Sequence, residues 1–163
     1  MQRATGPLAK AIQGAVSETF ENMAFIEAFR NDAGAGLGLE DATTHWARLE
    51  VETPVKGNVL VYCTARLVDQ IGTAVFGGLP DDLQIKPVMM DVISEVLNTI
   101  AGRLMMRMVP GETTFTLGVP QAGMGKFQKS EDMHWDRFEI ESDFFCVLVD
   151  RSIADYAQAN PSK

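Results

Sequence analysis

One short phrase of sequence occurs twice in this chain. Residues 45–52 read HWARLEVE, and residues 134–141 read HWDRFEIE, so five of the eight positions are identical. Apolar and polar residues alternate within the first copy, as in a β-strand that has one buried face. The repetition indicates that the chain is built from a duplicated unit.

The helical segment before each strand copy extends the repeat. Residues 16–21 read VSETFE, and residues 93–98 read ISEVLN. The two helices differ in one polar pair, because the first carries Glu18 and Glu21 where the second carries Glu95 and Asn98. A duplication that keeps its frame but changes one polar pair suggests one working half and one supporting half.

Local patterns predict the order of the elements. They indicate helices over residues 8–29, 64–76 and 84–108. Strands are predicted over 45–53, 58–64, 113–119 and within 134–149. Loops are predicted over 31–38 and 121–129, and a short helix or frayed tail from 152 onward. The expected fold is α/β (α+β), with a mainly antiparallel sheet and helices packed on one face. We expect a single domain over residues 1–163, with internal repeats at about 8–65 and 85–150.

Charge and composition narrow the class of protein. The chain has 22 acidic and 14 basic residues and a formal net charge of −8, which argues against non-specific binding to nucleic acid or to an anionic membrane surface. No apolar run has transmembrane length, and residues 1–10 lack the apolar stretch of a signal peptide. Cys63 and Cys146 lie in apolar runs and are predicted to be buried thiols. These features together predict a cytoplasmic protein.

The sequence gives little support for a metal site, a catalytic triad or a phosphate-binding loop. His45 and His134 have no Cys or His nearby in the sequence, which disfavours a metal site, and no G-x-S-x-G motif supports a catalytic triad. The glycines of residues 31–38 have no preceding strand and no following Lys-Ser/Thr, so a linker is favoured over a phosphate-binding loop.

A polar stripe on the long helix is the strongest candidate site. At 3.6 residues per turn, its members fall within about 60° of one another; they are Asp91, Glu95, Asn98 and Gly102. The opposite side is a predicted core face made of Met89, Ile93, Val96, Leu97, Ile100 and Leu104. The stripe has no basic residue to form salt bridges along the helix, and Gly102 costs on the order of 1 kcal/mol relative to Ala.

The chemistry of this stripe favours contact with a partner. An exposed carboxylate binds an ammonium group, and a carboxamide donates and accepts hydrogen bonds at once, so it holds and orients a water molecule. Neither group strongly activates water without a metal. The stripe therefore suits a protein that completes the active site of another protein.

The run Asp91-x-x-x-Glu95-x-x-Asn98 resembles the signature helix of the CheC/CheX/FliY chemotaxis phosphatases. Pro120 lies near the place of a proline in the family pattern, and duplicated halves are typical of the family. The first half has Glu21 where the motif has asparagine, so the chain resembles CheX, which keeps one motif.

The resemblance implies removal of the aspartyl phosphate from a CheY-like response regulator. Glu95 would bind the active-site lysine of the regulator, and Asn98 would position the attacking water, with Asp91 and Gly102 contacting the partner. The regulator would supply Mg²⁺, so the chain would need no cofactor of its own, and a homodimer is expected. Such catalysis fits a reaction that depends on positioning and charge stabilisation.

Other functions stay open at this stage. The stripe would also suit a non-catalytic module that binds a response regulator or a flagellar switch protein. A structural or sensory domain that has lost its activity is a further alternative. A metal-dependent phosphatase acting alone is the weakest, because the sequence shows no clustered ligands.

Overall fold

One mixed β-sheet organises the molecule. In the computed structural model, which describes residues 1–32, 36–39, 43–77, 85–128 and 130–161, the strand order is β1-β7-β8-β4-β3-β5, while β2 also pairs with β7 and β6 with β3. The elements are β1 (Gln2–Arg3), α1 (Gly6–Ala24), β2 (Phe29–Arg30), β3 (Thr43–Thr53), β4 (Gly57–Cys63), α2 (Ala65–Phe76), α3 (Ile85–Met108), β5 (Thr116–Leu117), β6 (Gln121–Lys126), β7 (Met133–Ile140), β8 (Asp143–Asp150) and α4 (Arg151–Ala159). Only β1 and β7 pair in parallel, so the sheet is mainly antiparallel, as predicted.

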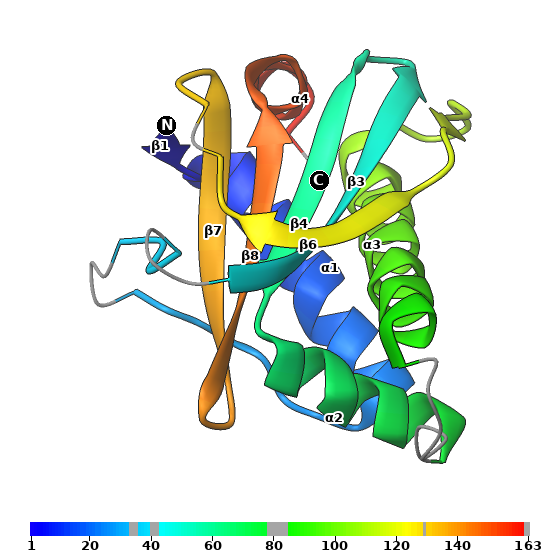
Figure 1. Ribbon diagram of the computed structural model, residues 1–163. Helices are drawn as coiled ribbons and strands as arrows, with labels where there is room; N and C mark the ends of the chain where they lie inside the picture. The colour runs from blue at the N-terminus through cyan, green and yellow to red at the C-terminus, as the bar shows by residue number, and fades with distance from the viewer. Residues whose placement is uncertain (33–35, 40–42, 78–84, 129, 162–163) are drawn as a thin grey trace.

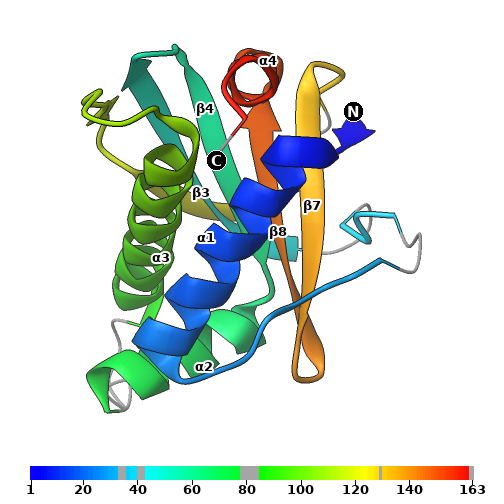
Figure 2. The ribbon, with the colours of Figure 1, turned by 180° about the vertical axis from the view of Figure 1, so that it is seen from behind.

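The helices lie on one face of the sheet. Figures 1 and 2 show α1, α2 and α3 together on the same side, with α4 at one end of the sheet beside β4 and β8. The main apolar core fills the space between these helices and the sheet. On the opposite face, Leu37 and Leu39 cover a smaller apolar cluster that includes Tyr62 and Leu148. The predicted α+β architecture with helices on one face is therefore confirmed.

Two similar halves meet in the middle of the sheet. The order helix, hairpin, helix occurs first as α1, β3–β4, α2 and again as α3, β7–β8, α4. The two hairpins join through β4 and β8, where Val59 is opposite Val149 and Cys63 is opposite Phe145. The two copies of the repeated phrase lie in β3 and β7, on either side of this join (Figure 1).

The first strand copy behaves as its alternation predicts. In β3, Ala47, Leu49 and Val51 are buried, while Arg48 and Glu50 are exposed. The buried side packs under the helices and contributes to the main core.

The second strand copy departs from that pattern. Asp136 has the place that Ala47 has in the first copy, and it is fully buried. Its carboxylate lies 2.6 Å from Arg30 Nε and 3.7 Å from Arg3 Nε, so it links β7 to β2 and β1. On the other face of β7, Arg137 is only 16% exposed and donates to the carbonyl of Leu37, so this polar side chain of the repeat is largely covered.

Local caps set the limits of α2. Thr64 Oγ1 accepts a hydrogen bond from the backbone N–H of Leu67 at 3.2 Å, which satisfies one of the unpaired donors of the first turn. Gly77 ends the helix with φ of +74°, a conformation that glycine adopts without steric cost. The helix predicted over residues 64–76 therefore agrees with α2 to within one residue.

Helix α1 is shorter than predicted. It ends at Ala24 rather than near residue 29, because Phe25 turns to a φ of +56° and its N–H bonds to the carbonyl of Phe20. The periodic pattern that continues past this point therefore belongs to an irregular segment and the short strand β2.

The segment after α3 also differs from prediction. The predicted strand over residues 113–119 is limited to Thr116–Leu117, and the predicted loop over 121–129 contains strand β6. Gly123 of β6 is opposite Trp46 of β3, and the indole ring lies where a side chain at 123 would be. Gly123 was predicted to lie in a loop but lies in a strand, where the absence of a side chain leaves room for the indole ring of Trp46.

The remaining expectations concern isolated groups. Cys63 and Cys146 are buried thiols, as predicted, and burial raises the pKa of Cys63. The searched part of the chain has no helix long and apolar enough to cross a membrane. Within the same part, no three His, Cys, Asp or Glu side chains gather in a way that would hold a metal ion. The predicted linker 31–38 and the predicted helix start at 84 fall partly outside the described residues.

Candidate functional site

The buried face of α3 fixes which of its residues reach the surface. Its predicted core side is confirmed, because each of these residues is at most 7% exposed: Met89, Ile93, Val96, Leu97, Ile100 and Leu104. These side chains join the main core. Figure 2 shows α3 beside α1 on the helical face of the molecule, so the opposite side of α3 looks outward.

The four predicted site residues are all on α3, and the three with side chains point outward. Asp91, Glu95 and Asn98 are exposed, and none has a hydrogen bond or ion pair with another described residue. A Cβ placed on Gly102 would meet no atom within 4 Å, so this glycine is not required by the packing of the chain itself. The carboxylates and the amide are therefore available to another molecule, and the backbone at 102 is open to close approach.

A small apolar hollow borders Glu95. It has a volume of about 280 Å³ and is formed where the end of α1, the end of α2 and the first half of α3 meet. Its lining is Met23, Ile71, Val75, Phe76, Val92 and Glu95. The sequence alone does not indicate this hollow, because its lining comes from three helices that are distant in sequence. The carboxylate of Glu95 thus lies at the edge of an apolar surface.

Two of the corresponding residues of the first half, Glu18 and Gly14, contact an arginine of α3. Glu18 pairs with the guanidinium of Arg107, and this hydrogen bond, with the nearby charge of Arg103, lowers the pKa of Glu18. Gly14, which corresponds to Asp91, gives room for the same guanidinium, since a Cβ there would lie 2.6 Å from Arg107 Nε. The sequence analysis did not identify Arg107, whose role depends on the packing of α1 against α3.

Phe25 is the residue of the first half that corresponds to Gly102 in the second. It follows the last residue of α1 and is 88% exposed, so it does not stand on a helical stripe beside Glu18. Pro120, the residue near the place of the family proline, is half-buried between β5 and β6.

Solved structures of chemotaxis proteins share this fold. CheX from Desulfovibrio desulfuricans has a TM-score of 0.70 at 21% identity, covering 87% of this chain and 97% of that one. A CheC-like superfamily protein from a Shewanella species has a TM-score of 0.67 at 14% identity, covering 90% and 99%. CheX from Borrelia burgdorferi, solved in a complex with CheY, BeF₃ and Mg²⁺, has a TM-score of 0.66 at 15% identity, covering 88% and 96%.

The sequence comparisons are negative. No family model matches the chain, and no curated protein matches it significantly. At 14–21% identity the structural likeness shows the fold alone, and the fold agrees with the resemblance read from the helix motif.

Proposed function

We propose that this chain, which has the fold of the CheX and CheC-like chemotaxis proteins, removes the phosphoryl group from an aspartate of a CheY-like response regulator. The observation that carries the proposal is the pair Glu95 and Asn98, three residues apart on one exposed face of α3, neither with a partner among the described residues. If these two side chains were buried or paired within the chain, they would serve its own structure. Because they are exposed, they can enter the active site of another protein.

The two side chains have different tasks in this proposal. Glu95 accepts hydrogen bonds from the active-site lysine of the regulator and so anchors α3 over the phosphoryl group. Asn98 accepts a hydrogen bond from the attacking water through its carbonyl oxygen and holds that water in line with phosphorus. Phosphoryl transfer depends chiefly on positioning and charge stabilisation, so a neutral amide is sufficient when the charges come from elsewhere.

The regulator supplies the remaining charges. The proposed Mg²⁺ and lysine belong to the regulator, and this chain contributes no cofactor. The CheX of Borrelia burgdorferi was solved with CheY and Mg²⁺ together, which supports a CheY-like partner for a chain of this fold. Asp91 adds negative charge beside the lysine, and Gly102 lets the regulator backbone approach. We further propose a cytoplasmic homodimer.

The proposal is tested by phosphate release from phosphorylated CheY-like regulators, with and without this protein. Asn98→Ala is expected to abolish most of the acceleration while regulator binding stays within about twofold, because a neutral amide at a surface adds little docking energy. Near-normal turnover by Asn98→Ala would show that the amide does not position the water.

Docking is tested separately at Glu95. Glu95→Ala is expected to weaken the complex and Glu95→Lys to prevent it, since truncating one partner of a buried charge pair costs on the order of 2–5 kcal/mol and reversal adds repulsion. The measurement is affinity for a regulator held in its active form with beryllofluoride and Mg²⁺. An unchanged affinity for Glu95→Lys contradicts the assigned role.

A non-catalytic binding module is the second candidate. Exposed Glu95 beside an apolar hollow would suffice for docking to a regulator or a flagellar switch protein without any contribution from Asn98. Binding without faster phosphate release, unaffected by Asn98→Ala, would favour this function.

A further inference from the structure

The exposed stripe of α3 continues beyond Gly102. Met106 is the next exposed residue on this side of the helix, since fifteen residues at 100° each place it about 60° from Asp91. Its side chain is 64% exposed. A large apolar side chain in water, one turn from an open glycine, is a contact surface that the chain itself does not use.

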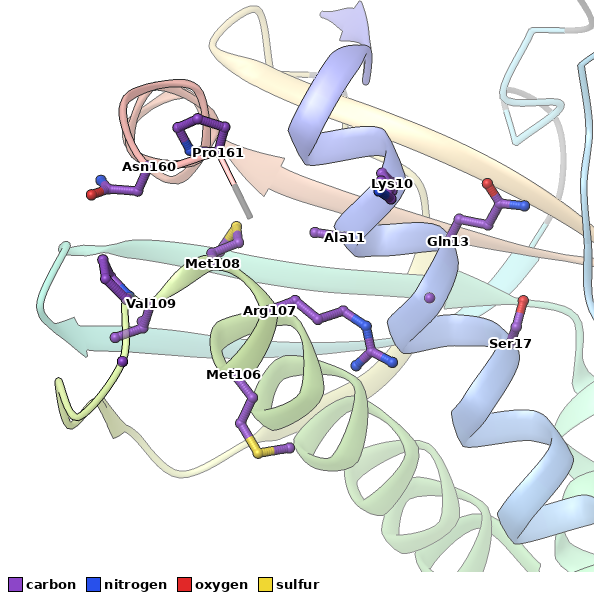
Figure 3. A pocket seen from close by; sticks show the side chains of 13 residues that line it. Lys10, Ala11, Gln13, Ser17, Met106, Arg107, Met108, Val109, Asn160 and Pro161 are labelled. Carbon is purple, nitrogen blue, oxygen red and sulfur yellow. The ribbon is translucent and has the colours of Figure 1, made fainter. Parts of the chain in front are cut away.

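A groove begins where the stripe ends. It has a volume of about 1180 Å³ and runs between α1, the end of α3 and the C-terminal segment. Met106 and Val109 line one side, and Ala11 and Gly14 of α1 line the other. Figure 3 shows Arg107 reaching from α3 toward α1, while Met106 projects from the outer side of α3. Because Met106 belongs to both the stripe and the groove, the two form one continuous surface.

Charge is separated along this surface. Asp91 and Glu95 at one end have no basic partner among the described residues. At the other end, the described residues that line the groove include Lys10 and Arg107 but no acidic residue. Arg107 is paired with Glu18, just outside the groove, while no ion pair to another described residue involves Lys10. The unpaired charge at this end of the surface is therefore the positive charge of Lys10, opposite in sign to the charges of Asp91 and Glu95.

We infer that a receiver domain bound at Glu95 and Asn98 also covers Met106 and enters this groove, with an apolar side chain on Met106 and a carboxylate near Lys10. The inference rests on the proposed function, because it extends the same docking surface. The distance along α3 from Asp91 to Met106 is about 22 Å at 1.5 Å per residue, a span that one globular partner covers. The charge separation sets the direction in which the receiver domain lies along α3.

The test uses variants that leave Glu95 and Asn98 intact. Met106→Ala and Lys10→Glu are each expected to raise KM for the phosphorylated regulator about tenfold or more while kcat at saturation stays within twofold, as for residues that dock the substrate but do not act on it. Matched controls are Phe29→Ala, a 61% exposed side chain on β2, and Lys126→Glu on β6, which should leave both constants unchanged.

Binding measurements separate this inference from the proposed function. In the Asn98→Ala background, affinity for the regulator held with beryllofluoride and Mg²⁺ should fall about tenfold on adding Met106→Ala. Tight binding by the protein with Asn98 intact, without faster phosphate release, would contradict the proposed activity, and the same affinity series would still decide the docking surface.

Three results would overturn the inference. One is an unchanged KM and affinity for both groove variants while the regulator is still dephosphorylated. Another is weaker self-association of Met106→Ala in ultracentrifugation with unchanged regulator affinity, which would show that a second copy covers the groove. The last is a panel of CheY-like regulators of which none binds, which would overturn the proposed function as well.

Discussion

At the scale of single residues, two buried polar side chains on corresponding strands determine local stability. Asp136 of β7 is fully buried against Arg30 and Arg3. His45 of β3 is 2% exposed, and its Nδ1 has no hydrogen-bond partner among the described residues. Neither follows from the alternation of the strands, which predicts the face of a residue but not how its polar atoms are satisfied.

Asp136→Ala is expected to lower the free energy of unfolding by about 3–5 kcal/mol, because it removes the buried carboxylate and leaves the partly buried guanidinium groups of Arg3 and Arg30 with only the exposed carboxylate of Asp32 as an ionic partner among the described residues. Burial raises the pKa of Asp136 and the two arginines oppose that shift, so the charged form depends on both of them. Urea denaturation measures the change. Asp155→Ala, at an exposed position of α4, is the control and should shift stability by no more than about 0.5 kcal/mol. A similar decrease in the free energy of unfolding for both variants would show that the buried carboxylate of Asp136 contributes no more to stability than the exposed carboxylate of Asp155.

His45 gives the fold a dependence on pH. Burial lowers the pKa of His45 in the folded protein, so the unfolded chain binds the proton more readily. Its contribution to stability is therefore complete above the unfolded pKa of about 6.5 and is lost as pH falls below that value toward the folded pKa. Compared with wild type, His45→Leu should show a smaller loss of unfolding free energy between pH 7 and pH 5. Parallel pH profiles for the two proteins would contradict the assignment.

At the scale of elements, β6 shows how a neighbour decides the role of a glycine. A Cβ on Gly123 would lie 2.6 Å from Trp46 Cζ2, whereas a Cβ on Gly125 would meet nothing within 4 Å. The two glycines lie in the same strand and differ only in what β3 places beside them.

Gly123→Ala is therefore expected to destabilise the protein by about 1–3 kcal/mol, because the rigid indole must move. Gly125→Ala should be neutral or slightly stabilising, since alanine loses less backbone entropy on folding than glycine. Thermal and urea unfolding of the pair provide the measurement. Equal effects at the two positions would mean that the ring of Trp46 moves aside without cost.

Elements with local determinants were the predictable ones. Helix α2 was correct at both ends because Thr64 and Gly77 act on their own turns. The core face of α3 was correct because its periodicity is long and regular. Strand β6 was not, because its strand character comes from pairing with β3, and α1 was too long because the turn at Phe25 leaves no pattern in the sequence.

At the scale of the whole molecule, the sequence predicted the arrangement of helices and strands better than the contacts made by the residues of each half. The α+β sheet with helices on one face was correct, and the stripe residues lie on the outer side of α3. The hollow beside Glu95, the groove beyond Met106 and the pairing of Glu18 with Arg107 were not foreseen. Each depends on contacts between helices, which no single segment encodes.

The two halves should differ in function. Glu18→Ala combined with Glu21→Ala is expected to leave kcat per chain within twofold, because the first half has no free glutamate at the corresponding place. Releasing Arg107 from Glu18 makes the adjacent groove more positive, so any change in KM should be a decrease. Phosphate release per chain measures both constants. If the double variant lost activity as fully as Asn98→Ala while folded and unchanged in oligomeric state, both halves would be needed.

The contact between Glu18 and Arg107 across Gly14 also bears on how such a protein can evolve. In the second half the corresponding Glu95 is exposed, whereas in the first half this contact makes Glu18 a link between α1 and α3. Glu21→Asn alone then restores the amide of the motif but not its free carboxylate. Recovery of a second site requires this link to be released first, at a cost in stability and with no immediate gain. The difference between the two halves, once established, is therefore difficult to reverse by single substitutions.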